Sequence, residues 1–418
     1  MIQRRTLMKI GAAGLACPLT QALTASAAPA TGAPANLREI GNRPVLRREL
    51  LPNPVMIQSI SVLQIDDQFM VRVRSTDGVE GTALCNPDLM RTLHRTLIDR
   101  IAPFFIKKDA RDLHDLQFEA YFKSYKWQGL PFWSPFAWLE LALLDLMGKT
   151  VGTSVANLIG NPVRRSSSLY YASEDRGSSA QYVIDELKGF VAESGSNAVK
   201  YRLGARLRTT AQSDARDREL IPLVRRELGD AAILYVDSNS SYDVKQALYF
   251  GRMLEEYKYG FFEEPVLFDD FDGTKAVAEG LSIPIAGGEI ESSLSRFEYM
   301  IRHRVVQIVQ PDLIYFGGLT RAIRVARMAE AAGMQVLPHM SDVGLGFLNV
   351  LFFAAVVPNT TDFQEYKGGE KVPYVVTGTN APLRPIKGRL QVPQGPGLGV
   401  TFDPAWLAKA KLVAEVKT

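Results

Sequence analysis

The second half of the chain alternates between short apolar runs and helical stretches, and this alternation is the strongest constraint on the fold. Eight runs of three to five residues lie at 169–172, 198–201, 232–236, 260–262, 283–286, 306–310, 335–338 and 361–364. Strands that alternate with helices pair in parallel through right-handed crossovers. Eight such units over ~200 residues match a closed eight-stranded barrel. An open doubly wound sheet is the competing architecture, but no Gly-x-Gly-x-x-Gly pattern follows an early strand to support its dinucleotide-binding form.

An ionisable residue ends each predicted barrel strand after the first. These residues are Lys200, Asp237, Glu263, Glu289, Asp312, His339 and Glu365. From Asp237 onward they are 26, 26, 23, 27 and 26 positions apart, which is one strand–helix unit per step. Because the carboxyl ends of parallel barrel strands open into one mouth, we expect these side chains to converge there. Converging charges are costly without a cation or a function, so this mouth is the predicted active site.

Three of these residues, Asp237, Glu263 and Glu289, are carboxylates on neighbouring strands. Carboxylates a few ångströms apart repel one another unless a hard cation lies between them. Oxygen-only ligands favour Mg²⁺, or Mn²⁺, over zinc. The sequence therefore predicts one divalent metal site. Glu264 is the adjacent alternative to Glu263, which we prefer because it keeps the regular spacing.

Asp312 and His339 end the sixth and seventh predicted strands. A carboxylate on one imidazole nitrogen fixes the tautomer and raises the basicity of the other nitrogen. The pair therefore predicts a general base. Of the three other histidines, His303 lies in a helix-end run of basic residues, which indicates a structural role.

Lys200 and Arg202 flank Tyr201 at the end of the second predicted strand. Strand alternation puts the two cations on one face and Tyr201 on the other. Two cations across from a metal site can hold a carboxylate substrate and stabilise charge that develops on it.

The remaining segments lie before and after the predicted barrel. Residues 54–165 start with alternating strands at 57–65 and 69–75, joined by a very short turn, and continue with helical periodicity. We assign 54–165 to an α+β domain, 166–380 to the barrel and 381–418 to a C-terminal segment. That segment shows short strands and a final helix near 405–415, and we expect it to pack onto the N-terminal domain.

The first 27 residues have the features of an export signal. A pair of arginines precedes a mildly apolar stretch rich in Gly and Ala, and Ala25-Ser26-Ala27 forms a small-x-small cleavage pattern. The stretch is too short and too weakly apolar to span a membrane. We therefore expect a twin-arginine signal peptide over 1–27, a Pro- and Ala-rich linker over 28–53, and a periplasmic protein.

Charge and cysteine content exclude several classes of function. Removing the signal's Arg4, Arg5 and Lys9 turns the net charge of +3 into 45 basic against 45 acidic residues. A neutral mature chain gives no electrostatic basis for binding nucleic acid or an anionic membrane. Cys17 and Cys85 are too few for a disulfide framework or a cysteine zinc site. Lipid attachment at Cys17 is a weaker alternative, because the residues before it fit that pattern poorly.

Several motifs together resemble the enolase superfamily, specifically its mandelate racemase/muconate lactonizing enzyme-like branch. The family's three metal-ligand motifs, its Asp–His dyad and its eighth-strand acid are matched by Tyr235-Val-Asp237-Ser-Asn239, Phe262-Glu263-Glu264-Pro265, Gly287-Gly288-Glu289, Gln310-Pro-Asp312, Pro338-His339 and Glu365. Segments 141–149 and 393–399 resemble those that join and complete the family's capping domain. The resemblance covers nearly all of the chain after the predicted linker.

The resemblance implies an α/β fold, a (β/α) barrel of the modified TIM-barrel type, with an α+β capping domain formed by the N-terminal region and the C-terminal segment. It also implies Mg²⁺-dependent removal of a proton α to the carboxylate of a small molecule. In that scheme His339 is the base and Asp312 orients it. Glu365 is a proton-bearing donor, which requires a dry site to raise its pKa, and Asn239 supports the metal or the substrate. Family members are often dimers or octamers, so we expect a homo-oligomer.

Arg202 departs from the family pattern, which usually has Lys-x-Lys on this strand with the second lysine often a base. A guanidinium stays protonated and cannot accept a proton. Unless Lys200 substitutes, His339 is the only base, which disfavours two-base racemisation. We therefore expect a lyase that dehydrates a sugar acid to a keto acid. A racemase, epimerase or cycloisomerase is the alternative, and a non-catalytic sugar-acid binding protein is the alternative from another class.

Overall fold

The computed structural model describes residues 33–342, 344–368, 372–378 and 383–418. Its contacts divide the chain into Met1–Thr31 and Gly32–Thr418, and every described residue belongs to the second unit. The predicted signal peptide, with Cys17, therefore lies outside the described residues. No described helix combines the length and the apolar composition that crossing a bilayer requires.

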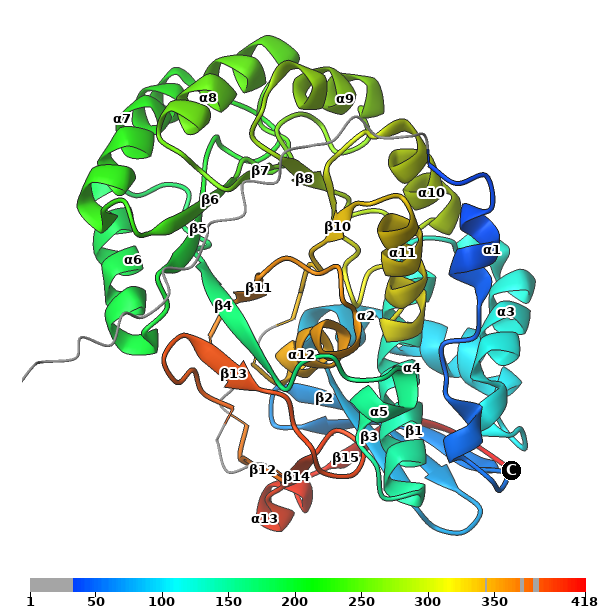
Figure 1. Ribbon diagram of the computed structural model, residues 1–418. Coiled ribbons are helices and arrows are strands. Elements are labelled where there is room, and N and C mark those ends of the chain that lie inside the picture. The colour runs from blue at the N-terminus through cyan, green and yellow to red at the C-terminus, as the bar shows by residue number, and fades with distance from the viewer. Residues whose placement is uncertain (1–32, 343, 369–371, 379–382) are drawn as a thin grey trace, which may run out of the picture. The chain divides into compact units, whose positions relative to one another are not determined.

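Eight parallel strands curl into a ring (Figure 1), so the barrel prediction is confirmed. Their order in the sheet is β10, β9, β8, β7, β6, β5, β4, β11. A backbone bridge between Val336 and Thr360 connects the β10 side to the approach of β11 and closes the ring. The strands are β4 (Ser166–Ala172), β5 (Ala198–Arg202), β6 (Ile233–Asp237), β7 (Phe261–Glu263), β8 (Ile285–Gly287), β9 (Ile308–Val309), β10 (Gln335–Val336) and β11 (Phe363–Tyr366).

Helices connect successive barrel strands, and α6 to α11 lie outside the ring (Figure 1). Local sequence signals set their ends: Thr210 and Ser213 form a reciprocal capping box at the start of α7, and left-handed Gly195 ends α6. The helices are α6 (Ala180–Ser194), α7 (Ala211–Leu228), α8 (Val244–Glu256), α9 (Phe271–Gly280), α10 (Leu294–His303), α11 (Leu319–Ala331) and α12 (Phe347–Val356).

The N-terminal domain is an antiparallel sheet packed against one long helix, α4. The sheet order is β15, β1, β2, β3. Gly81 on β3 permits close packing, because a Cβ there would clash with the α4 backbone at Ala142. The elements are β1 (Ile57–Ile65), β2 (Gln68–Ser75), β3 (Glu80–Cys85), α2 (Pro87–Thr96), α3 (Leu113–Lys123), α4 (Leu130–Thr150), α5 (Val155–Ile159) and β15 (Lys411–Lys417).

The C-terminal segment completes this domain, as expected, but not as a helix. Instead of a helix near 405–415, a single turn, α13 (Pro404–Leu407), precedes β15, which pairs antiparallel with β1. The open edge of β1 offered residues 411–417 backbone hydrogen bonds that outweighed the helix propensity of Ala, Leu and Lys. The segment also contains β13 (Arg389–Gln391), which pairs with β4, and β14 (Val400–Phe402), which pairs with β12 (Tyr374–Val376).

Buried Asp145 on α4 ties the parts of the domain together. Its Oδ2 accepts hydrogen bonds from the backbone N of Thr82 at 2.8 Å and from Lys149 at 2.7 Å. Its Oδ1 accepts from the backbone N of Leu398 at 2.9 Å. One carboxylate therefore joins β3, α4 and the C-terminal segment.

The described part of the predicted linker, residues 33–53, carries secondary structure that packs on the barrel. Helix α1 (Leu37–Asn42) lies against α11, and Leu37 is buried. Arg324 of α11 donates to the backbone oxygen of Gly41 at 3.2 Å. The buried Leu37 side chain and the hydrogen bond from Arg324 hold this segment against the barrel. Amino-acid composition alone does not reveal such contacts.

Candidate active site

The three predicted metal ligands meet at the mouth of the barrel. Asp237 and Glu263 end β6 and β7, and Glu289 follows β8 by two residues. Each offers a carboxylate oxygen within 4.8 Å of the others, and all three are buried. Glu263 Oε1 has no hydrogen-bond partner among the described residues. Buried, mutually repelling carboxylate oxygens fit a hard divalent ion such as Mg²⁺.

Glu264 is not part of this cluster, although it is also buried. Its backbone takes a left-handed conformation with φ 40°, and its side chain lines the adjoining cavity. Burial, with the charges of Glu289 and Glu263, raises its pKa well above the usual range. The choice of Glu263 from the regular spacing agrees with the observed cluster.

Asp312 and His339 form the expected dyad. Asp312 Oδ2 lies 2.6 Å from His339 Nδ1, and the other ring nitrogen, Nε2, lies 3.2 Å from Glu289 Oε2. Asp312 Oδ1 accepts hydrogen bonds from the backbone N of Ile314 and Tyr315, each at 2.6 Å. Backbone hydrogen bonds therefore fix the Asp312 carboxylate, and the imidazole directs Nε2 toward the carboxylate cluster.

The acidic surroundings of His339 determine its proton affinity. Burial lowers its pKa, but the charges of Glu289 and Glu365 and the hydrogen bond to Asp312 outweigh burial and raise the pKa to about 9. A divalent ion held by the triad would offset the charge of Glu289 and bring this pKa down toward neutrality. The imidazole is thus a strong base whose proton affinity depends on its carboxylate neighbours.

Lys200 forms ion pairs with two buried carboxylates. Its buried ammonium lies 2.6 Å from Glu263 Oε2 and 3.4 Å from Glu365 Oε2. Burial lowers its pKa, but the two carboxylates outweigh burial, so that the pKa is raised. The two carboxylates therefore favour the protonated form of the lysine.

Arg202 contacts the carboxylate cluster and also lines the cavity. Its Nη1 pairs with Asp237 Oδ2, and its Nη2 donates to Glu174 Oε1 at 2.9 Å. Nη1 also donates to Asn239 Oδ1 at 3.4 Å, and the backbone N of Asn239 donates to Asp237 Oδ1 at 2.7 Å. Asn239 therefore orients a metal ligand and borders the cavity, in line with its expected supporting role.

Glu365 lies where predicted, but its surroundings oppose the expected proton-bearing state. It is fully buried within β11, and burial alone would raise its pKa. The charges of Lys200, Lys367, His339 and Arg202 outweigh burial and lower the pKa well below the usual range. These cations favour the ionised carboxylate, and the proton-bearing role stays a prediction; Glu365 contacts two lysines, Lys200 and Lys367. The sequence pattern did not reveal that Lys367, two residues after Glu365, also lines the cavity at the barrel mouth.

A cavity of about 310 Å³ opens over these groups. The predicted residues at its wall are Arg202, Asn239, Glu289 and His339. The cavity is also lined by three charged residues that were not predicted from the sequence: Glu174, Arg206 and Lys367. Alternation was a usable signal for Lys367, which lies two residues after Glu365 on the same face, and for Glu174, two residues past the end of β4. No strand periodicity extends to Arg206, which lies in a loop.

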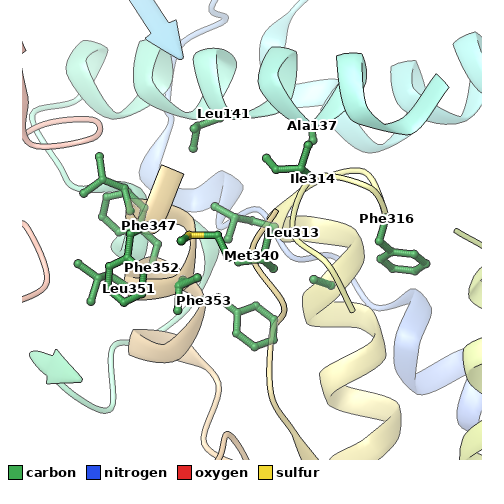
Figure 2. Close-up of a cluster of buried hydrophobic side chains, with 14 of the residues drawn as sticks. Ala137, Leu141, Leu313, Ile314, Phe316, Met340, Phe347, Leu351, Phe352 and Phe353 are labelled. Carbon is green, nitrogen blue, oxygen red and sulfur yellow. The ribbon is translucent and has the colours of Figure 1, made fainter. Parts of the chain in front are cut away.

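A buried apolar cluster supports the dyad (Figure 2). It includes Leu313 and Met340, the residues that follow Asp312 and His339 in the chain. Ala137 and Leu141 of α4 approach the cluster from the N-terminal domain, and Phe347 of α12 lies on the barrel side. The capping helix thus packs against the loops that carry the catalytic pair.

Comparison with known proteins agrees with this geometry. A family model described as "Enolase C-terminal domain-like" matches residues 182–406, and a model described as "Mandelate racemase / muconate lactonizing enzyme, N-terminal domain" matches residues 45–160. Among solved structures, a mandelate racemase/muconate lactonizing protein from Paracoccus denitrificans PD1222 complexed with magnesium has a TM-score of 0.78 at 27% identity. That match covers 86% of this chain and 99% of the other.

Two curated proteins illustrate the reactions found among relatives. Arabinonate dehydratase of Saccharolobus solfataricus is 29% identical over 267 residues, which are 63% of this chain and 68% of that protein. D-galactarolactone cycloisomerase of Agrobacterium fabrum is 27% identical over 274 residues, which are 63% of this chain and 70% of that protein.

Proposed function

The chain belongs to the mandelate racemase branch of the enolase superfamily, and we propose that it is a magnesium-dependent dehydratase of a sugar acid. Membership makes it an enzyme, a lyase or an isomerase, that uses Mg²⁺. The observation that carries the choice of dehydration is the Asp312–His339 pair beside the carboxylate triad. Arg202 stands where the family often has a second base, and Lys200 is held protonated.

Binding of the substrate carboxylate uses the positive charges at the mouth. Asp237, Glu263 and Glu289 would hold Mg²⁺, which supplies positive charge beside that carboxylate. Lys200 and Arg202 add two fixed cations on the neighbouring strand. Cations placed in advance stabilise the negative charge that develops when the α-proton leaves.

His339 performs both proton transfers in this scheme. Nε2 accepts the α-proton, and the electron pair of the broken C–H bond moves toward the carboxylate to form an enediolate. The bond from the β-carbon to its hydroxyl then breaks as the pair returns, and protonated Nε2 gives its proton to the departing hydroxide. Water and an enol leave the reaction, and the enol tautomerises to a 2-keto acid.

The test is a panel of sugar acids incubated in D₂O with Mg²⁺-loaded protein. We expect a 2-keto acid from at least one of them, and a loss of at least 10³-fold in kcat for His339→Asn. His303→Asn is the matched control, because His303 is exposed at the end of α10, and it should keep full activity. Near-normal turnover by His339→Asn would refute the mechanism.

Cycloisomerisation is the second candidate, favoured by the similarity to D-galactarolactone cycloisomerase. The same D₂O experiment distinguishes the two reactions. A cycloisomerase or epimerase returns an isomer of its substrate with deuterium at the α-carbon, whereas a dehydratase releases a keto acid. Sugar-acid binding without catalysis receives no support, because the triad and the dyad are both assembled.

Export by the twin-arginine route and a homo-oligomeric state complete the proposal. The arginine pair and the small-x-small pattern support export. Fractionation of cells that produce the full chain should place it in the periplasm, and Arg4→Lys with Arg5→Lys should retain it in the cytoplasm.

Sedimentation of the purified protein as a monomer would contradict the oligomer.

A further inference from the structure

Both apolar and cationic side chains line the cavity over the active site. Leu207, Phe268 and Ile290 line it, and each is a large apolar side chain exposed to solvent. The cations that line it are Arg202, Arg206 and Lys367. The reaction proposed above uses Arg202 but gives no role to the other two cations.

Lys367 follows β11 and reaches the cavity beside Glu365. Its ammonium lies 3.2 Å from Glu174 Oε1 and 3.6 Å from Glu365 Oε1, and its side chain is 12% exposed. Because Arg202 also contacts Glu174 Oε1, at 2.9 Å, two cations already hold one carboxylate at this wall. The wall therefore has the geometry and the charge to bind a carboxylate group.

Arg206 is an unpaired cation on a constrained turn. No hydrogen bond or ion pair to another described residue involves its side chain, which is exposed and lines the cavity. Arg206 and Leu207 both take left-handed backbone conformations, with φ 51° and 59°. Such conformations are costly for these residue types and persist where the surroundings enforce them. The turn is held by the backbone N of Leu207, which donates to Asn239 O at 3.0 Å.

A third arginine lies close by. Arg176 has two buried guanidinium nitrogens, Nε and Nη2, without a partner among the described residues. Burial and the charges of Arg202 and Arg206 lower its pKa to about 10. The cavity wall also carries the acidic side chains Glu174, Glu264 and Glu289, and of these three Glu174 is the one that pairs with Arg202 and Lys367. An additional anion would therefore be stabilised here.

We propose that Arg206 and Lys367 form a second anion subsite, which binds the distal carboxylate of a dicarboxylic sugar acid while its reacting carboxylate lies at the metal. The inference rests on the proposed function and narrows its substrate class. A diacid carries a charged group at both ends, whereas the corresponding monoacid ends in a neutral hydroxyl. Hydrogen bonds to a charged group are worth about 10- to 100-fold in affinity, so the subsite selects the diacid.

The test compares diacids and monoacids of the same configuration, such as galactarate with galactonate and glucarate with gluconate. Affinity is measured calorimetrically with Mg²⁺ and the His339→Asn protein, which prevents turnover during titration. The best diacid should bind at least 10-fold more tightly than its monoacid. Arg206→Met should reduce that ratio about 10-fold, and Arg206→Lys should retain part of it.

Arg208→Met is the matched control, because Arg208 is exposed on the same loop but is not part of the cavity wall. It should leave the ratio unchanged. Removing the competing negative charge with Glu174→Gln should tighten diacid binding. A monoacid that binds as tightly as its diacid overturns the subsite. So does an equal change of the affinity ratio in Arg206→Met and Arg208→Met.

The wild-type enzyme separates this inference from the proposed function. Turnover of monoacids without any diacid preference overturns the subsite alone. Tight diacid binding that Arg206→Met weakens, without formation of a keto acid, supports the subsite and overturns the dehydratase. Absence of binding by both classes of acid overturns both.

Discussion

At the scale of single residues, the active site combines charge pairs with a cluster of three carboxylates. Lys200 lies against Glu263, Arg202 against Asp237, and Asp312 against His339. The three carboxylates still repel one another where their oxygens meet. Repulsion of this kind destabilises the folded protein and strengthens its binding of a divalent cation.

We predict that Glu289→Gln separates stability from metal binding. The variant should unfold at a higher temperature than the wild type in EDTA, because one repelling charge is gone. It should also lose the Mg²⁺-induced stabilisation, which is ~2.7 kcal/mol at a metal concentration 100-fold above Kd. Differential scanning calorimetry with and without Mg²⁺ measures both effects.

Glu291→Gln is the control for this experiment. Glu291 is similarly buried, but its carboxylate pairs with Arg296 at 2.8 Å, so its variant should keep the full response to Mg²⁺. A normal Mg²⁺ response in Glu289→Gln would show that Glu289 is not a ligand.

At the scale of elements, one buried carboxylate connects the N-terminal domain to the barrel. Glu140 of α4 accepts a hydrogen bond from the backbone N of Thr320, in the first turn of α11, at 3.3 Å, and its carboxylate also contacts the Thr320 hydroxyl. Burial raises the pKa of Glu140 to about 7, although the hydrogen bonds from Thr320 and Leu319 act in the opposite direction. The contact between these two helices is therefore sensitive to pH.

We predict that this carboxyl group makes the protein less stable as pH rises. Its pKa is 4.5 without burial and about 7 in the folded state, so the folded state binds the proton more tightly. The stabilisation is fully present below pH 4.5 and is lost as pH rises through 7, by at most about 3 kcal/mol. Chemical denaturation at pH 5 and pH 8 measures it, and Glu140→Gln should gain stability relative to the wild type at pH 8.

The comparison variant is Glu119→Gln, at an exposed position on α3. Its stability should follow the wild type at both pH values. If the difference between Glu140→Gln and the wild type were the same at pH 5 and pH 8, the carboxyl group would not titrate in this range.

At the scale of the whole molecule, the capping domain contributes to the catalytic geometry through packing. The cluster of Figure 2 places Leu141 of α4 near Leu313 and Met340, the chain neighbours of the dyad. Trp138 of α4 also donates a hydrogen bond from its indole nitrogen to Asp342 Oδ2 at 3.2 Å, three residues after His339. Displacement of α4 would therefore move the base.

We predict that Leu141→Ala lowers both stability and activity. Removal of a buried leucine side chain costs about 2–5 kcal/mol, depending on how far the cavity collapses. Because that cavity would lie behind the dyad, kcat/KM for the sugar acid identified in the panel should fall about 10-fold. Urea unfolding and steady-state kinetics provide the two measurements.

Leu220→Ala on α7 is the matched variant, since Leu220 is fully buried away from α4. It should lose comparable stability and retain kcat/KM. Equal losses of activity in the two variants would mean that general destabilisation, and not support of the dyad, explains the effect.

The positions of the catalytic groups could be predicted because the barrel repeats one unit. Equal spacing along the chain becomes equal spacing around a ring, so residues at successive strand ends must meet. Asp237, Glu263 and Glu289 therefore converge, and Asp312 contacts His339. Lys367 and Glu174 follow the same alternation beyond the ends of β11 and β4, where the prediction did not extend the alternation.

The chain's own pattern of strands, helices and strand-end charges determined the fold, the carboxylate cluster and the Asp312–His339 pair, because periodicity and residue type are local properties. Tertiary structure decided the rest. The open edge of β1 made residues 411–417 a strand, and distant segments brought Lys200 and Lys367 against Glu365. The turn that brings Arg206 to the cavity also depends on Asn239, 32 positions after Leu207 in the chain. Pairing partners and electrostatic neighbours come from distant segments, so only the folded chain brings them together.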